Sequence, residues 1–180
     1  MPHLERLNAV LALAPAIMYA VVLGFLVTTH ERWYLWLLIW LLISGASNPL
    51  LKRTFAHTAP RISDRPSVCG TLYGDTPCRS CKIFMFRGVT RTRVGTGMPS
   101  GHVQTIATAL GYMVTSFGSE GNALVLIGVG LLLVVVAQQR VASKCHTALQ
   151  TVVGGALGFL IGAIGGALVH GRFGLALSQY

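Results

Sequence analysis

Apolar residues form five long runs along the chain, separated by short polar turns and by one long polar stretch. A helix needs about 20 apolar residues to cross the hydrocarbon core of a bilayer, which is roughly 30 Å thick. The runs therefore predict transmembrane helices at residues 8–29, 33–51, 99–117, 122–137 and about 147–169. The fold class that follows is an all-α integral membrane bundle of about five helices, formed by residues 1–180 as a single domain.

The polar stretch at residues 52–97 differs from the rest of the chain. It carries nine Lys or Arg residues and turn-forming sequences such as Tyr73-Gly74-Asp75. Such a composition predicts a long extramembrane loop between the second and third helices. The first apolar run resembles a signal peptide in position, but its length favours a helix that stays in the mature protein.

The composition agrees with a membrane protein rather than a soluble enzyme. Hydrophobic residues make up 53% of the chain, charged residues 11%, and the mean hydropathy is +0.63. The formal net charge is +9. A positive balance of this size suits an anionic lipid surface or a phosphorylated substrate, and the apolar runs make nucleic acid the least favoured partner.

Four cysteines leave several interpretations open. Cys78 and Cys81 form a C-x-x-C pair, and Cys69 lies nine residues upstream. This pattern fits half of a zinc site, a disulfide or ordinary loop thiols, and no fourth metal ligand is evident. Cys145 is most simply a packing residue.

Glycines recur at a four-residue spacing in the last apolar run. The four positions are Gly154, Gly158, Gly162 and Gly166. Residues with this spacing share one helix face, so the stripe predicts close approach of a neighbouring helix.

Polar residues stand where the predicted helices begin or end. The second helix ends at Lys52, the third begins at Pro99, the fourth ends at Arg140 and the fifth begins near His146. Because consecutive helices cross in opposite directions, all four points face the same side of the membrane. Ionisable groups at membrane depth are costly, so this convergence predicts a functional site.

The third helix opens with Pro99-Ser100-Gly101-His102. Proline suits a first helical turn, and the backbone N–H groups of Ser100 and Gly101 lie at the positive end of the helix dipole, where anions bind. Three cations add positive charge near this point: Lys52, Arg61 and Arg140. The ligand that this site predicts is a phosphate.

His146 and Gln150 stand at positions i and i+4. On one helix face the glutamine amide can hydrogen-bond the imidazole.

These motifs resemble the type 2 phosphatidic acid phosphatase superfamily. Its pattern is Lys, six residues, Arg-Pro; then Pro-Ser-Gly-His; then Ser-Arg, five residues, His, three residues, Asp. The second motif is complete here. In the third, Gln139 replaces the serine and Gln150 replaces the aspartate, while in the first, Ala59 occupies the arginine position. Arg61 is the preferred substitute for that arginine, and Arg65, which precedes Pro66, is the alternative.

A second resemblance, to the dolichyl diphosphatase branch, rests on residues 97–104 and on Gln150, since glutamine recurs in that branch in place of the aspartate. The resemblance implies hydrolysis of a lipid phosphate ester or anhydride without metal or cofactor. It implies that His146 is the nucleophile that forms a phosphohistidine, that His102 is the acid and then the base, and that Gln150 orients His146. The residues it implies for phosphate binding are Lys52, Arg61, Ser100, Gly101 and Arg140.

Two other functions stay open: a catalytically silent family member that binds lipid or supports membrane structure, and a small transporter. Orientation is open as well. By our count the motif side carries 12 Lys or Arg residues and the far side two, which favours a cytoplasmic site, whereas the family analogy favours the lumen.

Overall fold

The computed structural model describes residues 10–63, 97–117 and 123–170. These residues are helical and contain no strand. The elements are α2 (Ala14–Thr29), α3 (Arg32–Thr58), α4 (Pro60–Ser63), α6 (Gly101–Phe117), α7 (Ala123–Ala142) and α8 (Ala148–His170). The predicted all-α membrane bundle is therefore confirmed.

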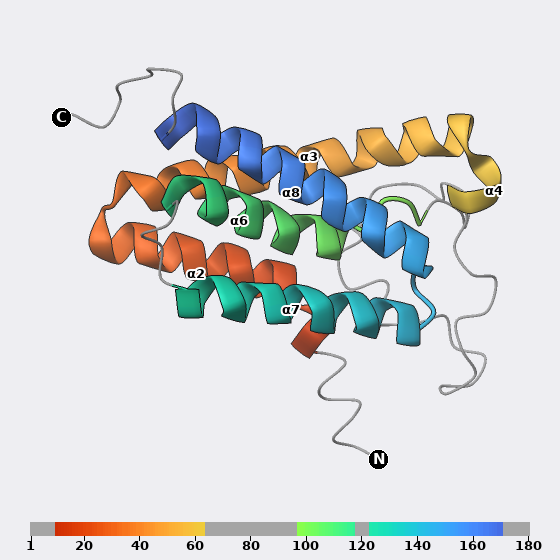
Figure 1. Cartoon of the computed structure of the whole chain (residues 1–180), viewed down its shortest axis with the longest axis horizontal. Helices are drawn as coiled ribbons and strands as arrows, with labels where there is room; N and C mark the ends of the chain where they lie inside the picture. Colours follow the sequence, from red (N-terminus) through yellow and green to blue (C-terminus); the bar gives the residue numbers. More distant parts are fainter. Residues whose placement is uncertain (1–9, 64–96, 118–122, 171–180) are drawn as a thin grey trace, which may run out of the picture.

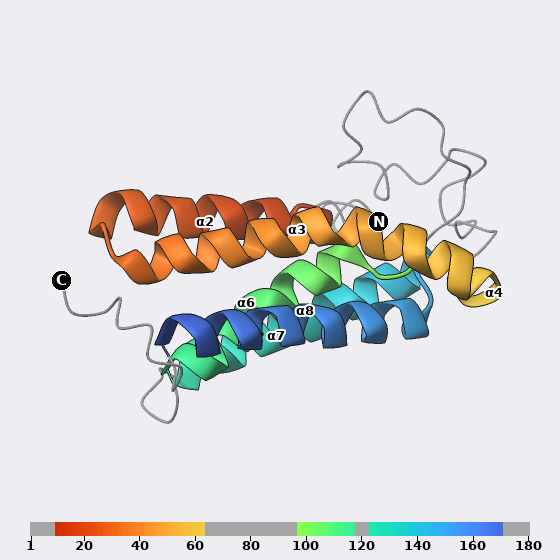
Figure 2. The same ribbon diagram turned by 90° about the horizontal axis from the view of Figure 1, so that it is seen from above.

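The five long helices lie side by side in two layers (Figure 2), with α2 and α3 in one and α6, α7 and α8 in the other. The helices α2, α6 and α8 run in one direction, and α3 and α7 run back (Figure 1). In consequence the end of α3, the start of α6, the end of α7 and the start of α8 share one end of the bundle. The loop predicted at 52–97 is wrong at its start, where residues up to Ser63 belong to α3 and α4. Residues 64–96, with three of the cysteines, lie outside the described residues.

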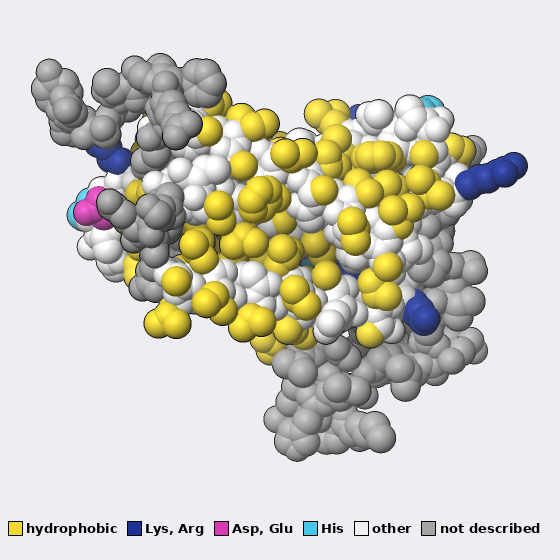
Figure 3. Space-filling view, viewed as in Figure 1, with side chains coloured by type: hydrophobic (Ala, Val, Ile, Leu, Met, Phe, Trp, Pro, Cys, Tyr) yellow, Lys and Arg dark blue, Asp and Glu magenta, His cyan; other side chains and the backbone are white. Residues whose placement is uncertain are grey.

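Three of the described helices are long and apolar enough to span a membrane: Arg32–Thr58, Ala123–Ala142 and Ala148–Val169. A shorter apolar helix covers Ala14–Thr29. Hydrophobic side chains cover the sides of the bundle, and charged side chains gather towards its ends (Figure 3). This distribution suggests a multi-pass membrane protein, because apolar side surfaces are favourable in contact with lipid and unfavourable in contact with water.

The second helix is longer than predicted. Helix α3 continues past Leu51 to Thr58 and contains Pro49 within it. The charge at Lys52 does not end the helix. Most side chains in the last two turns are polar and exposed, so this part of α3 can extend beyond the apolar region into water.

Helix α6 is the central helix of the bundle. Every residue from Val103 to Ala109 is buried. Its neighbour α8 approaches it through the glycine stripe: a Cβ added at Gly154 would lie 2.7 Å from the Ser100 carbonyl oxygen, and Cβ atoms at Gly158 and Gly162 would overlap the backbone of α6. The predicted role of the glycine stripe is confirmed.

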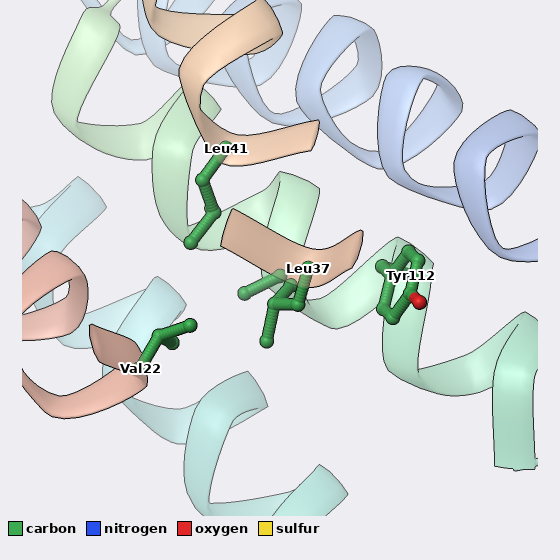
Figure 4. Packing of buried hydrophobic residues seen from close by; sticks show 5 residues of the cluster. Val22, Leu37, Leu41 and Tyr112 are labelled. Carbon is green, nitrogen blue, oxygen red and sulfur yellow. The ribbon is translucent and has the colours of Figure 1, made fainter. Parts of the chain in front are cut away.

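Apolar packing joins the two layers on the side away from the shared polar end. Val22 of α2, Leu37 and Leu41 of α3 and Tyr112 of α6 are buried together (Figure 4). The Tyr19 hydroxyl of α2 also donates to the Leu41 carbonyl oxygen at 2.7 Å. These contacts fix α2 and α3 over α6.

Candidate active site

Segments far apart in sequence meet at the polar end of the bundle. The Ser63 carbonyl oxygen accepts the Gly97 N–H at 2.7 Å, and the Gln150 carbonyl oxygen accepts the Ser100 N–H at 3.1 Å. The end of α4, the segment before α6 and the start of α8 are thereby joined. The predicted convergence of these segments is present in the structure.

Arg140 connects the two histidines of the predicted site. Its side chain is almost fully buried, at 1% exposure, and its Nη2 lies 2.6 Å from His102 Nε2. Its carbonyl oxygen accepts the N–H groups of Cys145 at 3.1 Å and of His146 at 3.2 Å. One residue thus contacts His102 through its side chain and positions His146 through its backbone.

The turn after α7 makes the backbone contacts of Arg140 possible. Lys144 adopts a left-handed conformation with φ of 55°, which turns the chain back over the end of the helix. Ser143 satisfies the helix end by donating its hydroxyl to the Gln139 carbonyl oxygen at 2.6 Å. His146, at 5% exposure, is thereby buried beside the end of α7.

His102 Nε2 has two polar neighbours that require opposite hydrogen-bond roles. A guanidinium can only donate, so beside Arg140 the His102 Nε2 acts as acceptor. The same nitrogen lies 3.0 Å from the Ala12 carbonyl oxygen, which can only accept. A ring with its proton on Nδ1 accepts from Arg140, whereas a ring with a proton on Nε2, neutral or charged, donates to Ala12. The hydrogen bond that forms therefore depends on whether Nε2 carries a proton.

Unpartnered polar groups lie close in sequence to these residues. Within the described part of the chain, the Ser100 hydroxyl and both amide atoms of Gln139 are buried without a hydrogen-bond partner. Ser100 directly precedes α6, where N–H groups of the first turn have no acceptor within the helix. Buried polar groups normally have partners. Anion binding at this helix start stays a prediction.

One detail of the predicted anion site is wrong. The Ser100 N–H is bonded to the Gln150 carbonyl oxygen, so it is not available to a phosphate. The first α6 bond within this region runs from the Gln104 N–H to the Ser100 carbonyl oxygen at 2.9 Å. The other backbone donor of the prediction, the Gly101 N–H, stands at the first residue of α6.

Gln150 has a different set of contacts from the one predicted. Helix α8 begins at Ala148, so His146 precedes the helix and the expected i, i+4 pair on one helix face is wrong. Thr147 and Gln150 form a reciprocal cap instead, in which Gln150 Oε1 accepts the Thr147 N–H and the Gln150 N–H donates to Thr147 Oγ1, both at 3.2 Å. This is the capping box that T-x-x-Q sequences form at helix starts.

The amide nitrogen of Gln150 connects α8 to α4. Gln150 Nε2 donates to the carbonyl oxygens of Ile62 at 3.1 Å and Ser63 at 3.3 Å. This contact places the first-motif segment beside the third. Orientation of His146 by Gln150 stays a prediction.

The predicted phosphate-binding cations have different surroundings. Lys52 is half-buried inside α3 rather than at its end, and Arg61 is exposed on α4. No hydrogen bond among the described residues involves Arg61, and Arg65 lies outside them. The roles of both arginines in replacing the motif arginine at Ala59 stay predictions.

Cys145 is more than a packing residue. It is buried at 1% exposure and it is disulfide-bonded. Its Sγ lies 3.7 Å from Arg140 Nη1 and 3.5 Å from the Ser143 hydroxyl. A sulfur held in this way adds a covalent constraint next to His146.

A buried polar network between α3 and α6 was not expected from the sequence. Asn48 Nδ2 donates to Gln104 Oε1 at 2.7 Å, and Gln104 Nε2 donates to the Ser44 carbonyl oxygen at 3.0 Å. Asn48 Nδ2 also lies 3.4 Å from the Pro99 carbonyl oxygen. The network therefore positions the start of α6. The available signal was the presence of two amides at membrane depth, where polar groups need partners.

The family comparison agrees with these motifs. The family model described as the PAP2 superfamily matches residues 33–173. The chain belongs to this superfamily, and membership supports a phosphatase-type function, the hydrolysis of a phosphate ester. Comparison with curated proteins and with solved structures gave no match.

Proposed function

We propose that the chain is an integral membrane lipid phosphatase or diphosphatase that acts through a phosphohistidine intermediate. The observation that carries this proposal is the double contact of Arg140 with His102 and His146. The substrate class is a lipid phosphate of the polyprenyl diphosphate or phosphatidate type. The dolichyl diphosphatase branch is the one that Gln150 favours.

In the first step, a ring nitrogen of His146 attacks phosphorus in line with the leaving oxygen. The new P–N bond forms as the P–O bond breaks, and protonated His102 gives its proton to the leaving oxygen. The leaving group is a lipid alcohol or a lipid monophosphate. In the second step, His102 takes a proton from water, the resulting hydroxide oxygen bonds to phosphorus, and the P–N bond breaks to release inorganic phosphate.

Charge on the transferred phosphoryl oxygens is balanced by fixed donors, which is the main task in phosphoryl transfer. Arg140, the Ser100 hydroxyl and the Gly101 N–H supply donors at the start of α6. Lys52 and Arg61 complete the proposed set. The proposed steps use no metal or cofactor.

The phosphate contact of Arg140 competes with its contact to His102. A phosphate oxygen that accepts from the guanidinium would draw it away from Nε2 of His102. The ring would then be able to carry a proton, with the Ala12 carbonyl oxygen as its acceptor until the leaving oxygen takes the proton. Substrate binding and protonation of the acid are coupled in this scheme.

The test is phosphate release by the purified protein from a polyprenyl diphosphate and from phosphatidate. We expect His146→Ala to abolish release and His57→Ala, an exposed histidine on the last turn of α3, to retain it. The alternative is a catalytically silent family member, which is favoured by the loss of the motif arginine at Ala59 and of the motif serine at Gln139. Absence of release by folded wild-type protein, or equal release by His146→Ala, would support that alternative.

We further propose that the site faces an oxidising compartment. The disulfide at Cys145 supports this side, because disulfides persist where thiols are not kept reduced. The excess of Lys and Arg at the same end favours the cytoplasm. An impermeant maleimide applied to sealed vesicles of known orientation should label His57→Cys from the non-cytoplasmic side and Glu31→Cys from the other, and the reverse pattern would contradict the proposal.

A further inference from the structure

A cavity of about 480 Å³ lies between α2, α3, α6 and α7. Every side chain that lines it is apolar or aromatic. Ligand cavities of this size are typical of proteins that bind small molecules, but most also hold several polar groups. A cavity without them in a membrane protein suits a hydrocarbon.

One end of the cavity lies next to the candidate active site. Leu11 and Ala14 line it, and they flank Ala12, whose carbonyl oxygen is 3.0 Å from His102 Nε2. On α7 the cavity reaches Leu132, two helical turns before Arg140. The near end of the cavity therefore lies at the level of the contact between His102 and Ala12, where the buried side chains of Ile106 and Val136 also pack.

The cavity runs along the helices towards the opposite end of the bundle. On α2 and the residues just before it, the lining extends from Val10 to Phe25, roughly 20 Å at about 1.5 Å per residue. This covers much of one hydrocarbon core, which is about 30 Å thick. The shape matches an extended chain rather than a compact ligand.

Aromatic side chains line the far end. Phe25 stacks on Tyr34 with ring centroids 5.3 Å apart, and Trp33 meets Tyr34 edge-on at 4.9 Å. The lining residues Val21 and Val125 are half exposed, at 50% and 43%. The cavity is therefore accessible from the lipid-facing side between α2 and α7, and rigid aromatic rings stand at the end that a long chain would reach.

We propose that this cavity binds one hydrocarbon chain of the lipid phosphate whose headgroup occupies the site at His102 and Arg140, and that its aromatic end selects chain length. This inference rests on the proposed function. Apolar transfer alone gives little selectivity, because a hydrocarbon chain loses no water when it moves from lipid into the cavity. Selectivity comes instead from the shape of the aromatic end.

The test compares kcat/KM for a short-chain and a long-chain lipid phosphate with the same headgroup. Val125→Trp fills the far end and should lower the long-to-short ratio about tenfold, while Phe25→Ala opens it and should raise the ratio, on the scale by which pockets discriminate small changes in apolar size. The matched controls are Ile127→Trp on α7 and Leu23→Ala on α2. Both are exposed residues, at 57% and 49%, that do not line the cavity.

The long-to-short ratio of kcat/KM does not depend on the fraction of folded protein, because both substrates are measured on the same preparation. An unchanged ratio in both cavity variants overturns the proposal, and it is the result expected if a bilayer lipid that is not the substrate fills the cavity. If wild-type protein hydrolyses neither lipid, the proposed function fails, and binding is tested separately. A photoreactive group at the chain end of a lipid phosphate should then crosslink to Met113 or Phe25, whereas crosslinks to Ile127 and Leu23 overturn the proposal.

Discussion

Nη2 of Arg140 lies 2.6 Å from Nε2 of His102, although 38 residues and a helix reversal separate the two in sequence. The contact joins the Pro-Ser-Gly-His motif to the Arg–His motif inside a buried site. In the proposed function the Arg140 guanidinium also donates to phosphate oxygens, and an ammonium group does not reproduce its forked geometry.

Arg140→Lys should therefore lower kcat/KM for a lipid phosphate by about 10²–10³-fold, the loss typical of removing one donor to a developing charge. The lysine retains the charge but loses the forked geometry. The control is Gln138→Ala, which changes an exposed side chain on the same turn of α7. Steady-state kinetics in detergent or proteoliposomes measure the effect, and wild-type kcat/KM in Arg140→Lys would remove Arg140 from the site.

Gly158→Ala should destabilise the bundle by about 1–3 kcal/mol, the usual cost of overpacking. The added methyl group would overlap the Gln104 carbonyl oxygen, which is backbone and cannot move aside. Gly155→Ala is the matched control, because its methyl group would meet only Val103 Cγ1 at 3.6 Å. Thermal unfolding in detergent compares them, and equal stability of the two variants would contradict the close α6–α8 contact.

The glycine stripe was predictable because its spacing is local and helix periodicity alone places the four residues on one face. The order of the helices likewise placed the ends of α3 and α7 beside the starts of α6 and α8. The contacts of Gln150 were not predictable in this way. They depend on carbonyl oxygens of Ile62 and Ser63, 88 and 87 residues away, and on a helix that starts at Ala148, after His146.

Gln150→Ala should reduce stability more than Thr147→Ala. The threonine change removes the cap, worth about 1 kcal/mol, whereas the glutamine change removes one cap bond and also the donor to α4. Both variants are compared by thermal unfolding and by kcat/KM. If Gln150→Ala matched Thr147→Ala in both measurements, the contact between α8 and α4 would contribute nothing to stability or activity.

The polar network at Gln104 is another feature that the sequence did not reveal, because Asn48 and Gln104 lie 56 residues apart. Gln104→Leu would leave the buried amide of Asn48 without this acceptor, at a cost of about 1–3 kcal/mol. We expect lower stability together with a lower kcat, since Asn48 also contacts the Pro99 carbonyl oxygen just before α6, where the proposed phosphate site begins.

Thr54→Val is the control for Gln104→Leu. Thr54 is exposed, and among the described residues its hydroxyl bonds to the Leu50 carbonyl oxygen of its own helix alone. Rescue of kcat by Gln104→Glu or Gln104→Asn, with stability still low, would separate positioning of the turn from a general loss of packing. A kcat that follows folded fraction in all variants would leave the network with a structural role only.

The most direct test of the account is to trap the covalent intermediate. Wild-type protein is mixed with a lipid phosphate carrying labelled phosphorus, quenched in alkali, which preserves phosphohistidine, and digested for mass spectrometry. The account predicts label on His146, none in His146→Ala, and slower loss of label in His102→Ala because the base that activates water is missing. Turnover by wild-type protein with label on another residue, or with none while His146→Ala remains active, would contradict it.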